Sequence, residues 1–326
     1  MIENIVLTLL QIKGINRKTI LNEFDIKNFD YSFQDIKDLF RRVNIETKRV
    51  KMPSNEELQQ AIDDANLIIE KSRKENIKVV SFLDTLFPNM LRSIKDAPVL
   101  LFYKGNIECA NRRSVAIIGT RTPTEYGIKI ARQLGFILGR DEYTVISGLA
   151  IGCDMYGHKG CVQAKGESIA VLAGGLDKVY PASNRELAEE ILDNRGCLIS
   201  EYSTGTKPFP SFYVERDRLQ SGLSDGVIVI ETDVKGGTMH TVGYSLEEKR
   251  VLSCLQHPEN MLAEKKTRGN QKLIHEGKAI PIKDTNDLLI LKSLVEKKFN
   301  DRENININLE IKPVQNTIFD YGIKEN

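Results

Sequence analysis

The sequence has few cysteines and no arrangement that would make them metal ligands or disulfide partners. Its five cysteines are scattered over 326 residues, with no CxxC spacing and no cluster of cysteine and histidine. This pattern is typical of reduced thiols in a cytosolic protein and predicts no metal site. No apolar run approaches the ~18 residues that a membrane span requires, and the N-terminus carries an acid rather than a basic cluster. We therefore expect a cytoplasmic protein without a targeting segment, a metal or another cofactor.

Neither sign of charge dominates the chain. It holds 46 Lys and Arg against 45 Asp and Glu, a net charge of +1, which excludes a uniformly basic coat for nucleic acid but leaves room for a local patch. The densest basic cluster consists of Lys265, Lys266, Arg268 and Lys272. Such runs are more often solvated surface than binding sites. Phosphate binding must therefore come from particular residues in particular loops.

Residues 1–72 have the pattern of a small helical domain. Ile5, Leu9 and Ile12 recur at helical spacing, and the same spacing returns around residue 60. The turn Gly14–Asn16 has two interpretations: a DNA-binding turn between helices, or the plain turn of an αα-hairpin, which is commoner. We expect a helical domain of the SAM or helix-hairpin-helix kind, with weak support for a DNA role.

The pattern of apolar residues changes after residue 112. Short runs rich in Val and Ile alternate with amphipathic stretches, which is the pattern of parallel βαβ units. Strands are expected over 114–119, 143–148, 168–174, 197–202, 226–231 and 250–255, with a short edge strand near 279–282. Helices are expected near 127–139, 154–165, 185–194, 212–222 and 238–248. The predicted fold class is α/β, a doubly wound and mostly parallel Rossmann-like sheet over 112–298, preceded by the small helical domain.

Two further segments complete the predicted organisation. Residues 73–111 connect the helical domain to the core. After residue 284 we expect one helix, up to about 298, and then a polar tail over 299–326 that is partly disordered.

In an open α/β sheet, ligands bind at the carboxyl ends of the strands, so the residues just after each strand carry the most information. The first strand ends in Gly119, Thr120 and Arg121. Glycine permits close backbone approach, the next helix would present free N–H groups to an anion, and Arg121 can add a bidentate phosphate contact. A glycine turn here is also common without a ligand. The loop lacks the GxGxxG pattern, which argues against a standard dinucleotide site.

The fifth strand leads into a second glycine loop, Lys235-Gly236-Gly237-Thr238. Two glycines directly before a helix let consecutive N–H groups converge on one charge. Two such loops at neighbouring strand ends favour phosphate binding over a purely structural role. The phosphate could belong to a nucleotide or to a nucleic-acid backbone.

The other strand ends contain polar residues with plainer interpretations. Asp154 fits a helix N-cap better than a catalytic acid, and His158, one turn later, could hydrogen-bond locally. Ser183 or Asn184 fits the N-cap of the next helix, and Lys178 is expected at the same rim. We expect no catalytic residue among them.

Several blocks of the sequence now carry a family resemblance. Asp84-x-x-Phe87-Pro88-x-x-Leu91 is followed in order by GTR, SGLAIGCDMYGH, GGLDKVYPASNREL, SEY and FYVERDRLQSGLSD. These blocks and their order resemble the DprA/Smf DNA-processing proteins over about residues 75–295. An ordered series of this kind is far more specific than a single motif.

The resemblance implies a Rossmann-like core that binds and protects single-stranded DNA, forms a homodimer, and helps to load a RecA-type recombinase during transformation or recombination. It implies no catalysis and no membrane association. The candidate DNA or phosphate contacts carried over by position are Gly119, Thr120, Arg121, Lys178, Asn184, Arg216, Arg218, Lys235, Gly236, Gly237 and Thr238. Contacts to a phosphate backbone need charge and geometry but no base-reading groups, so we expect sequence-independent binding.

Three departures from the family pattern are present. Asp217 stands where the family's R-N-R block has asparagine, and Thr120 replaces the serine of its G-S-R block. A carboxylate between two arginines could weaken DNA binding or hold the arginines in place. The winged-helix domain that often ends the family's chains is expected to be missing.

Two alternatives remain. Gly236-Gly237-Thr238 followed by Glu247 or Glu248 is faintly similar to the motif of the lysine-decarboxylase-like (LOG) group, which would make the protein a nucleotide sensor or a phosphoribohydrolase. The proline, third glycine and glutamate spacing of that motif are absent. The other alternative is a dimeric interaction scaffold with a vestigial pocket.

Overall fold

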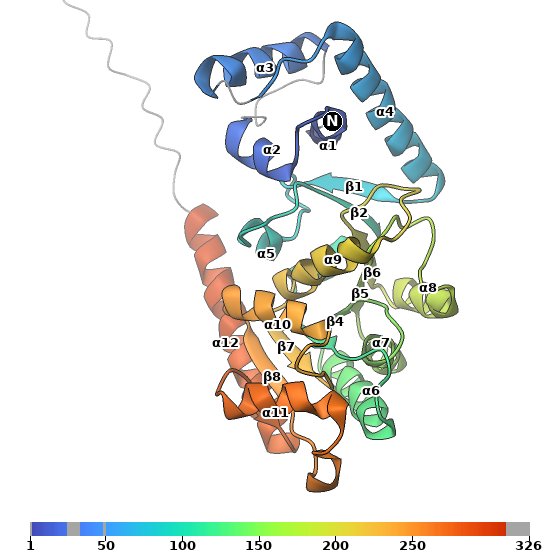
Figure 1. Ribbon diagram of the computed structural model, residues 1–326, viewed down its shortest axis with the longest axis vertical. Helices are drawn as coiled ribbons and strands as arrows, with labels where there is room; N and C mark the ends of the chain where they lie inside the picture. Colours follow the sequence, from blue (N-terminus) through green and yellow to red (C-terminus); the bar gives the residue numbers. More distant parts are fainter. Residues whose placement is uncertain (1, 25–32, 48–49, 311–326) are drawn as a thin grey trace, which may run out of the picture.

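The computed structural model describes residues 2–24, 33–47 and 50–310. Its N-terminal part is helical, as predicted, and forms the upper layer in Figure 1. The four helices are α1 (Ile2–Gln11), α2 (Arg17–Glu23), α3 (Phe33–Thr47) and α4 (Asn55–Lys74). Local chemistry explains where two of them begin. Asn16 accepts a hydrogen bond from the backbone N–H of Thr19, and Ser54 forms a reciprocal capping box with Glu57.

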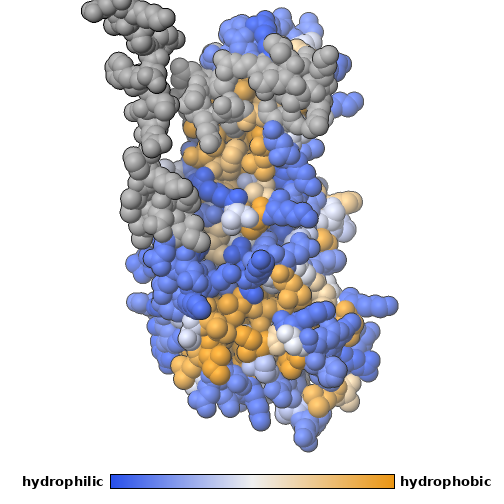
Figure 2. All heavy atoms as spheres, turned by 90° about the vertical axis from the view of Figure 1, so that its left-hand side faces the viewer, coloured by the Kyte–Doolittle hydropathy of each residue, from blue (hydrophilic) through white to orange (hydrophobic). Residues whose placement is uncertain are grey.

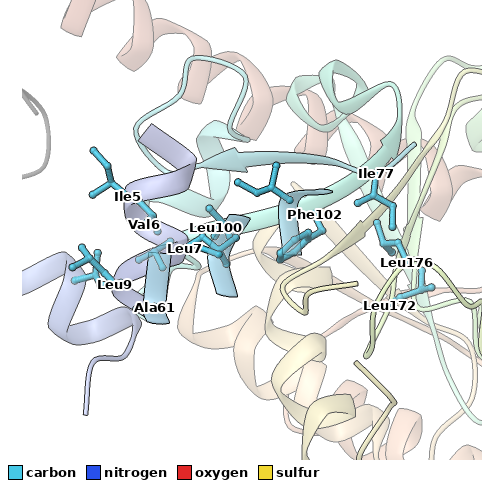
Figure 3. Packing of buried hydrophobic residues seen from close by; sticks show 14 of the residues in the cluster. Ile5, Val6, Leu7, Leu9, Ala61, Ile77, Leu100, Phe102, Leu172 and Leu176 are labelled. Carbon is cyan, nitrogen blue, oxygen red and sulfur yellow. The ribbon is translucent and has the colours of Figure 1, made fainter. Parts of the chain in front are cut away.

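The helical layer packs on one end of a single nine-stranded sheet. Leu9 of α1 and Leu58 of α4 belong to one buried cluster with Leu100 and Phe102 of the second strand, and Figure 3 shows α1 lying beside that strand. Layer and sheet therefore share a core, and the predicted boundaries between helical domain, connecting segment, core and tail stay predictions.

The sheet has the strand order β1-β2-β6-β5-β4-β3-β7-β8-β9. The strands are β1 (Lys78–Ser81), β2 (Leu100–Gly105), β3 (Ser114–Ile118), β4 (Thr144–Ser147), β5 (Ser168–Val171), β6 (Cys197–Ser200), β7 (Gly226–Val229), β8 (Val251–Leu255) and β9 (Ile280–Ile282). All strands from β3 to β9 pair in parallel. The predicted doubly wound sheet and its edge strand near 279–282 are confirmed.

The connecting segment contributes more than the sequence suggested. Its strand β1 pairs with β2, and β2 pairs with β6, both in antiparallel fashion, which extends the sheet toward the helical layer. Most predicted strands end slightly too late. The run expected over 168–174, for example, ends as a strand at Val171, because the residues that follow turn into the ligand-facing loops.

Helices cover both faces of the sheet (Figure 1). The helices of the core are α5 (Asn89–Arg92), α6 (Glu125–Arg140), α7 (Cys153–Gln163), α8 (Arg185–Asp193), α9 (Pro210–Gly222), α10 (Thr238–Glu247), α11 (Arg268–His275) and α12 (Thr285–Glu310). Along β3, Ala116 packs in one cluster with α9, α10 and α11, whereas Val115 packs in another with α6, α7 and α12. This alternation is what a strand buried on both faces requires.

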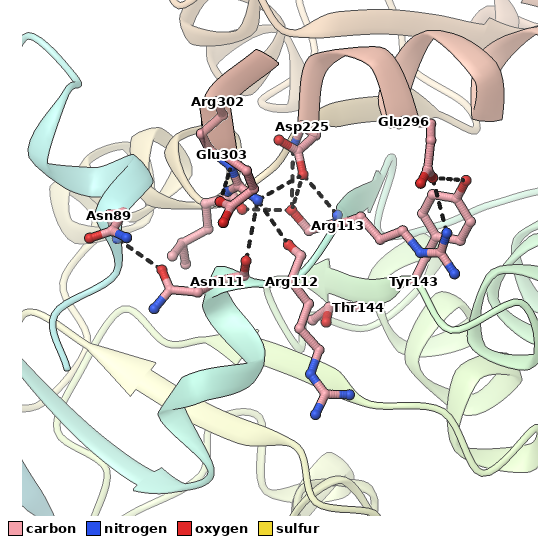
Figure 4. Close-up of polar contacts among 12 residues, drawn as sticks. Asn89, Asn111, Arg112, Arg113, Tyr143, Thr144, Asp225, Glu296, Arg302 and Glu303 are labelled. Carbon is pink, nitrogen blue, oxygen red and sulfur yellow. Dashed lines mark hydrogen bonds and ion pairs between the residues drawn. The ribbon is translucent and has the colours of Figure 1, made fainter. Parts of the chain in front are cut away.

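The expected helix end at about residue 298 is wrong, because α12 continues to Glu310. Its polar residues find partners on the core, as Figure 4 shows. Nη2 of Arg302 donates to the backbone carbonyl of Asn111 at 3.3 Å and lies 3.7 Å from Oδ2 of the buried Asp225. The Glu296 carboxylate lies 3.0 Å from Nη1 of Arg113. Residues 311–326 of the predicted tail lie outside the described residues.

Helix length and apolar content decide whether a helix can cross a membrane. Within residues 2–24, 33–47 and 50–310, no helix combines the two to the extent that a membrane span requires.

Candidate phosphate-binding site

A pocket of about 630 Å³ opens where β3, β4 and β7 end. The loop after β3, helix α9 and the first turn of α10 form its walls. The structure brings together seven of the predicted site residues in its lining: Gly119, Thr120, Arg121, Arg216, Gly236, Gly237 and Thr238. The expectation that ligand-facing loops meet at the carboxyl ends of the strands is met by this geometry.

The Gly236–Gly237 loop leaves the start of α10 open. Gly237 occupies the N-cap position, no side chain caps this helix end, and a Cβ on Gly237 would meet nothing within 4 Å. The backbone N–H groups of Met239 and His240 donate to the carbonyls of Gly236 and Gly237 at 3.0 Å each, which leaves the N–H groups of Gly237 and Thr238 for a ligand, and the helix dipole adds partial positive charge there. This end of α10 therefore has the geometry of an anion site.

The start of α6 is closed instead, which corrects the prediction for the first glycine loop. Thr124 caps the backbone N–H of Gly127 at 3.0 Å, and the Glu231 carboxylate accepts from the backbone N–H of Thr124 at 2.9 Å. The Thr124 hydroxyl also donates to Glu231. Burial alone would raise the pKa of Glu231, but His257, whose Nε2 lies 3.6 Å from Oε1, and the hydrogen bonds from Thr124 hold that pKa below its ordinary value. The protein's own carboxylate thus occupies the place predicted for a bound anion.

Arg121 and Arg216 line the same pocket in different ways. Arg121 is exposed, and its guanidinium lies 5.0 Å from the ring centroid of Tyr213. Arg216 is buried, and its Nη1 donates to the backbone carbonyl of Val171 at 2.8 Å. Its Nε makes no hydrogen bond among the described residues and lies 3.3 Å from Oδ1 of Asp217. Arg121 is therefore the adaptable cation of the rim, and Arg216 is a fixed cation below it.

The floor of the pocket is acidic. Asp217 accepts from Nε2 of Gln220 at 2.8 Å, and burial raises the pKa of Asp217 to about 6 despite the neighbouring Arg216. Oδ2 of Asp154 accepts from the backbone N–H of Gly148 at 3.0 Å. Asp154 is therefore not the N-cap of α7 as predicted. That position belongs to a glycine, and the carboxylate holds the preceding loop instead.

Lys178 and Asn184 lie outside this pocket. Lys178 is exposed and lines a small recess, separate from the pocket, together with Tyr180 and Tyr213. Asn184 is buried, and its Nδ2 donates to the backbone carbonyl of Leu149 at 2.8 Å. Asn184 precedes α8 as predicted, but its side chain caps nothing and supports the loop that follows β4.

Arg218 is placed away from the pocket altogether. Its side chain is 2% exposed, and Nη2 lies 2.6 Å from a carboxylate oxygen of Glu201. Its Nε donates to the backbone carbonyl of Asp96 at 2.9 Å. Arg17 of α2 contacts Asp96 and lies 3.6 Å from Glu201. Arg218 is thus part of an ion network that joins the core to the helical layer.

The remaining polar residues of interest lie outside the pocket. Lys235 is exposed beside Gly236 but does not line the pocket. Glu247 and Glu248, the glutamates considered for the LOG-type motif, line a different pocket. Within the described residues no three His, Cys, Asp or Glu side chains gather as metal ligands would.

Lys265 and Lys266 were not among the predicted contacts, yet both line the pocket. The signal was present in the sequence as a basic run. Its position beside the glycine loops depends on how the segment between β8 and α11 folds back, which a charge count does not reveal.

Residues 78–292 match the protein family described as DNA recombination-mediator protein A. The chain belongs to this family. Protein Smf of Synechocystis sp. is 33% identical over 225 residues, which are 68% of this chain and 55% of that protein. DNA processing protein DprA of Streptococcus pneumoniae is 38% identical over 192 residues, 58% of this chain and 65% of that one. The chain therefore spans less than two thirds of the length of these relatives.

Solved structures of the DprA family agree with this assignment. DNA processing protein A of S. pneumoniae superposes with a TM-score of 0.71 at 29% identity, over 88% of this chain and 97% of that one. DNA processing protein A of Helicobacter pylori, which binds single-stranded DNA, gives a TM-score of 0.59 at 26% identity, over 68% and 96%. The resemblance found in the sequence blocks is thus confirmed.

Proposed function

We propose that this protein binds single-stranded DNA without regard to sequence and without catalysis, protects it, and assists a RecA-type recombinase in recombination or transformation. The open N-terminus of α10 beside the exposed Arg121 carries the proposal. It supplies backbone N–H groups and an adaptable guanidinium for two phosphates, in a family that includes an H. pylori relative known to bind single-stranded DNA. The proposal places the protein in the cytoplasm, where such DNA and the recombinase occur.

Exposed aromatic rings beside the pocket support a single strand as the ligand. Tyr180 is 60% exposed and lines the recess that holds Lys178, and Tyr213 lines both this recess and the pocket. Phe209 is 61% exposed and stands at the start of α9, one turn before Tyr213. Unpaired bases can stack on such rings, whereas the bases of a duplex cannot. Alternating rings and cations therefore suit splayed nucleotides whose phosphates follow the rim.

A binding role rather than catalysis is supported by the state of a Ser–His pair on α7 and β5. Nδ1 of His158 lies 2.7 Å from Oγ of Ser168, but both residues are fully buried. Burial lowers the pKa of His158 to about 3, so the imidazole is neutral at physiological pH and no substrate reaches it. No nucleotide hydrolysis is expected from this pair.

The proposed homodimer has a candidate surface on α12. Leu289, Ile290 and Leu294 are exposed, whereas Leu291 and Val295 on the opposite side of the helix are buried against the core. Figure 2 shows apolar atoms gathered on the lower half of the side on which α12 lies. Exposed apolar patches of this kind are typical of protein interfaces.

Fluorescent oligo(dT) tests the proposal in competition with an unlabelled duplex of matching length. We expect the single strand to bind more tightly. Arg121→Ala should weaken binding to every sequence alike and reduce the salt dependence by about one phosphate contact. Arg140→Ala removes an exposed arginine at the far end of α6 and is the matched control. Equal or tighter duplex binding would contradict the proposal, and an unaffected Arg121→Ala variant would remove Arg121 from the site.

A further inference from the structure

The segment between β8 and α11 folds back onto the pocket. It projects at the lower end of the molecule in Figure 1 and contains two short 3₁₀ turns, Glu259–Met261 and Lys265–Thr267. The second turn brings Lys265 and Lys266 into the lining of the pocket that holds Arg121 and Gly237. A third stretch of chain, distant in sequence from both glycine loops, thus completes the wall.

Buried contacts fix this turn in place. The Thr267 hydroxyl is buried and donates to the backbone carbonyl of Glu264 at 2.9 Å. The backbone N–H of Gly269 donates to the carbonyl of Thr232 at 2.8 Å, and the backbone N–H of Thr232 donates to Oδ1 of Asn270 at 3.0 Å. The start of α11 is therefore tied to the end of β7. The turn that carries the two lysines is therefore hydrogen-bonded to the core, while the Lys265 side chain is exposed and that of Lys266 is half-buried.

Lys265 and Lys266 change the sign of the net charge of the pocket lining. Without them, two arginines, Arg121 and Arg216, stand against three aspartates, Asp154, Asp217 and Asp233. Such a lining repels phosphate. The two lysines reverse the balance and make the pocket attractive to an anion.

Among the residues that the structure describes, Lys266 forms no ion pair and Lys265 forms one weak ion pair. Nζ of Lys265 lies 3.6 Å from Oδ2 of Asp233, and the lysine side chain is 75% exposed. Ion pairs this exposed contribute little, so Lys265 can leave Asp233 for a better partner.

We propose that Lys265 and Lys266 bind backbone phosphates of single-stranded DNA, so that the segment between β8 and α11 is a third wall of the DNA site. The inference rests on the proposed function and extends it to residues outside both glycine loops. Lysine suits this role because its flexible stem follows a phosphate whose position varies along an irregular strand.

The test compares the double variant Lys265→Ala/Lys266→Ala with Lys272→Ala/Lys278→Ala. The control removes the same charge from two half-exposed lysines that contact Glu276 and lie outside the pocket. Binding of labelled oligo(dT) is titrated over a range of salt. For a single strand, each phosphate that the protein no longer neutralises reduces the slope of log K against log salt by about 0.7. We expect a reduction of about 1.4 for the pocket variant and an unchanged slope for the control.

A second variant tests whether the lysines contact phosphate or only neutralise the charge of Asp233. If the lysines act only by neutralising Asp233, adding Asp233→Asn to the pocket variant restores wild-type affinity and slope, and the inference is overturned. The inference is also overturned if the Lys265→Ala/Lys266→Ala variant binds oligo(dT) with the same affinity and salt slope as the wild type. Weaker binding by Arg121→Ala with undiminished binding by the lysine variant leaves the proposed function standing without this wall. Failure of the wild-type protein to bind oligo(dT) defeats both. Thermal melting of each variant verifies that it is folded.

Discussion

Asp217 is the departure from the family pattern that the structure makes most informative. The sequence left open whether this carboxylate faces the two neighbouring arginines or turns away from them. It lines the pocket and lies 3.3 Å from Nε of Arg216, while Arg218 points elsewhere. A phosphate about 6 Å from Asp217 would be repelled by roughly 2 to 3 kcal/mol at an effective dielectric near 20, before screening by salt. We therefore expect Asp217→Asn to bind oligo(dT) several-fold more tightly at low salt, with a smaller gain at high salt.

The same prediction can be tested a second way, through the pH dependence of DNA binding. Because the pKa of Asp217 is about 6 in the folded protein, the wild-type side chain loses its charge as the pH falls through that value. The affinity gain of the asparagine variant should then disappear, since both proteins present a neutral group. Asparagine also keeps an acceptor for Nε2 of Gln220. The variant is thus close to a pure removal of charge.

Asp217→Asn should also make the fold more stable near neutral pH. An acid whose pKa is raised on folding makes the folded state less stable as the pH rises from its ordinary value, 3.8, to the folded value near 6. The difference corresponds to about 3 kcal/mol as an order of magnitude, from about 1.4 kcal/mol per pH unit. Asp217→Asn should therefore melt at a higher temperature near neutral pH and lose this advantage in acid.

The assay is fluorescence anisotropy with labelled oligo(dT) at about pH 7.5 and about pH 5, at low and at high salt, alongside thermal melts. Asp193→Asn removes an exposed carboxylate at the end of α8, outside the pocket, and is the matched control. An affinity ratio between variant and wild type that is equal at both pH values would refute the reasoning. So would a variant that binds no better than wild type at any salt. Either result would assign Asp217 a structural role.

Three further predictions test other parts of the structure. Arg218→Ala should destabilise the fold by about 3 to 5 kcal/mol in urea melts, because it leaves the Glu201 carboxylate without its buried partner; a large loss of DNA affinity in the folded variant would return Arg218 to the binding site. Glu231→Gln should melt at a lower temperature near neutral pH, with the gap closing as the pH falls below about 4.5, since a lowered pKa stabilises the fold only while the acid is ionised; equal melting at both pH values would contradict this. Leu289→Asp should weaken the association of the proposed homodimer in sedimentation equilibrium without changing the melting curve of the monomer, and an unchanged association constant would exclude this face of α12.

The alternation of strands and helices was predictable because the core strands are buried on both faces. Residues 168–171, for example, are all buried and form a continuous apolar run apart from Ser168. The strands β1 and β2 were missed because they lie outside the regular alternation of strands and helices and pair in antiparallel fashion with partners distant in sequence. The continuation of α12 was missed because its polar residues, such as Arg302, look solvated until Asp225 and Asn111 are placed beside them.

The site was harder to predict than the fold, because the sequence does not show in which direction each side chain points. Arg216 and Arg218 belong to one sequence block, but residues two apart on a helix point to nearly opposite sides, so only Arg216 lines the pocket. Asn184 stands at a helix start, yet its amide is used to hold the backbone of Leu149. Lys265 and Lys266 show the reverse case. They had no motif to mark them, and only the fold brings them to the glycine loops.

The two glycine loops look equivalent in sequence, and Glu231 is what makes them different. It lies two residues after the end of β7 and a few residues before Gly236 in the same loop. Its carboxylate turns toward α6 and accepts hydrogen bonds from Thr124, while the rest of the loop leads into α10 and leaves that helix start uncapped. One loop therefore fills one anion site with the protein's own charge and opens the other. Under the proposed function, we expect a phosphate in the pocket to bind at α10, with Arg121, Lys265 and Lys266 in the same lining, because the start of α6 is already occupied by an anion.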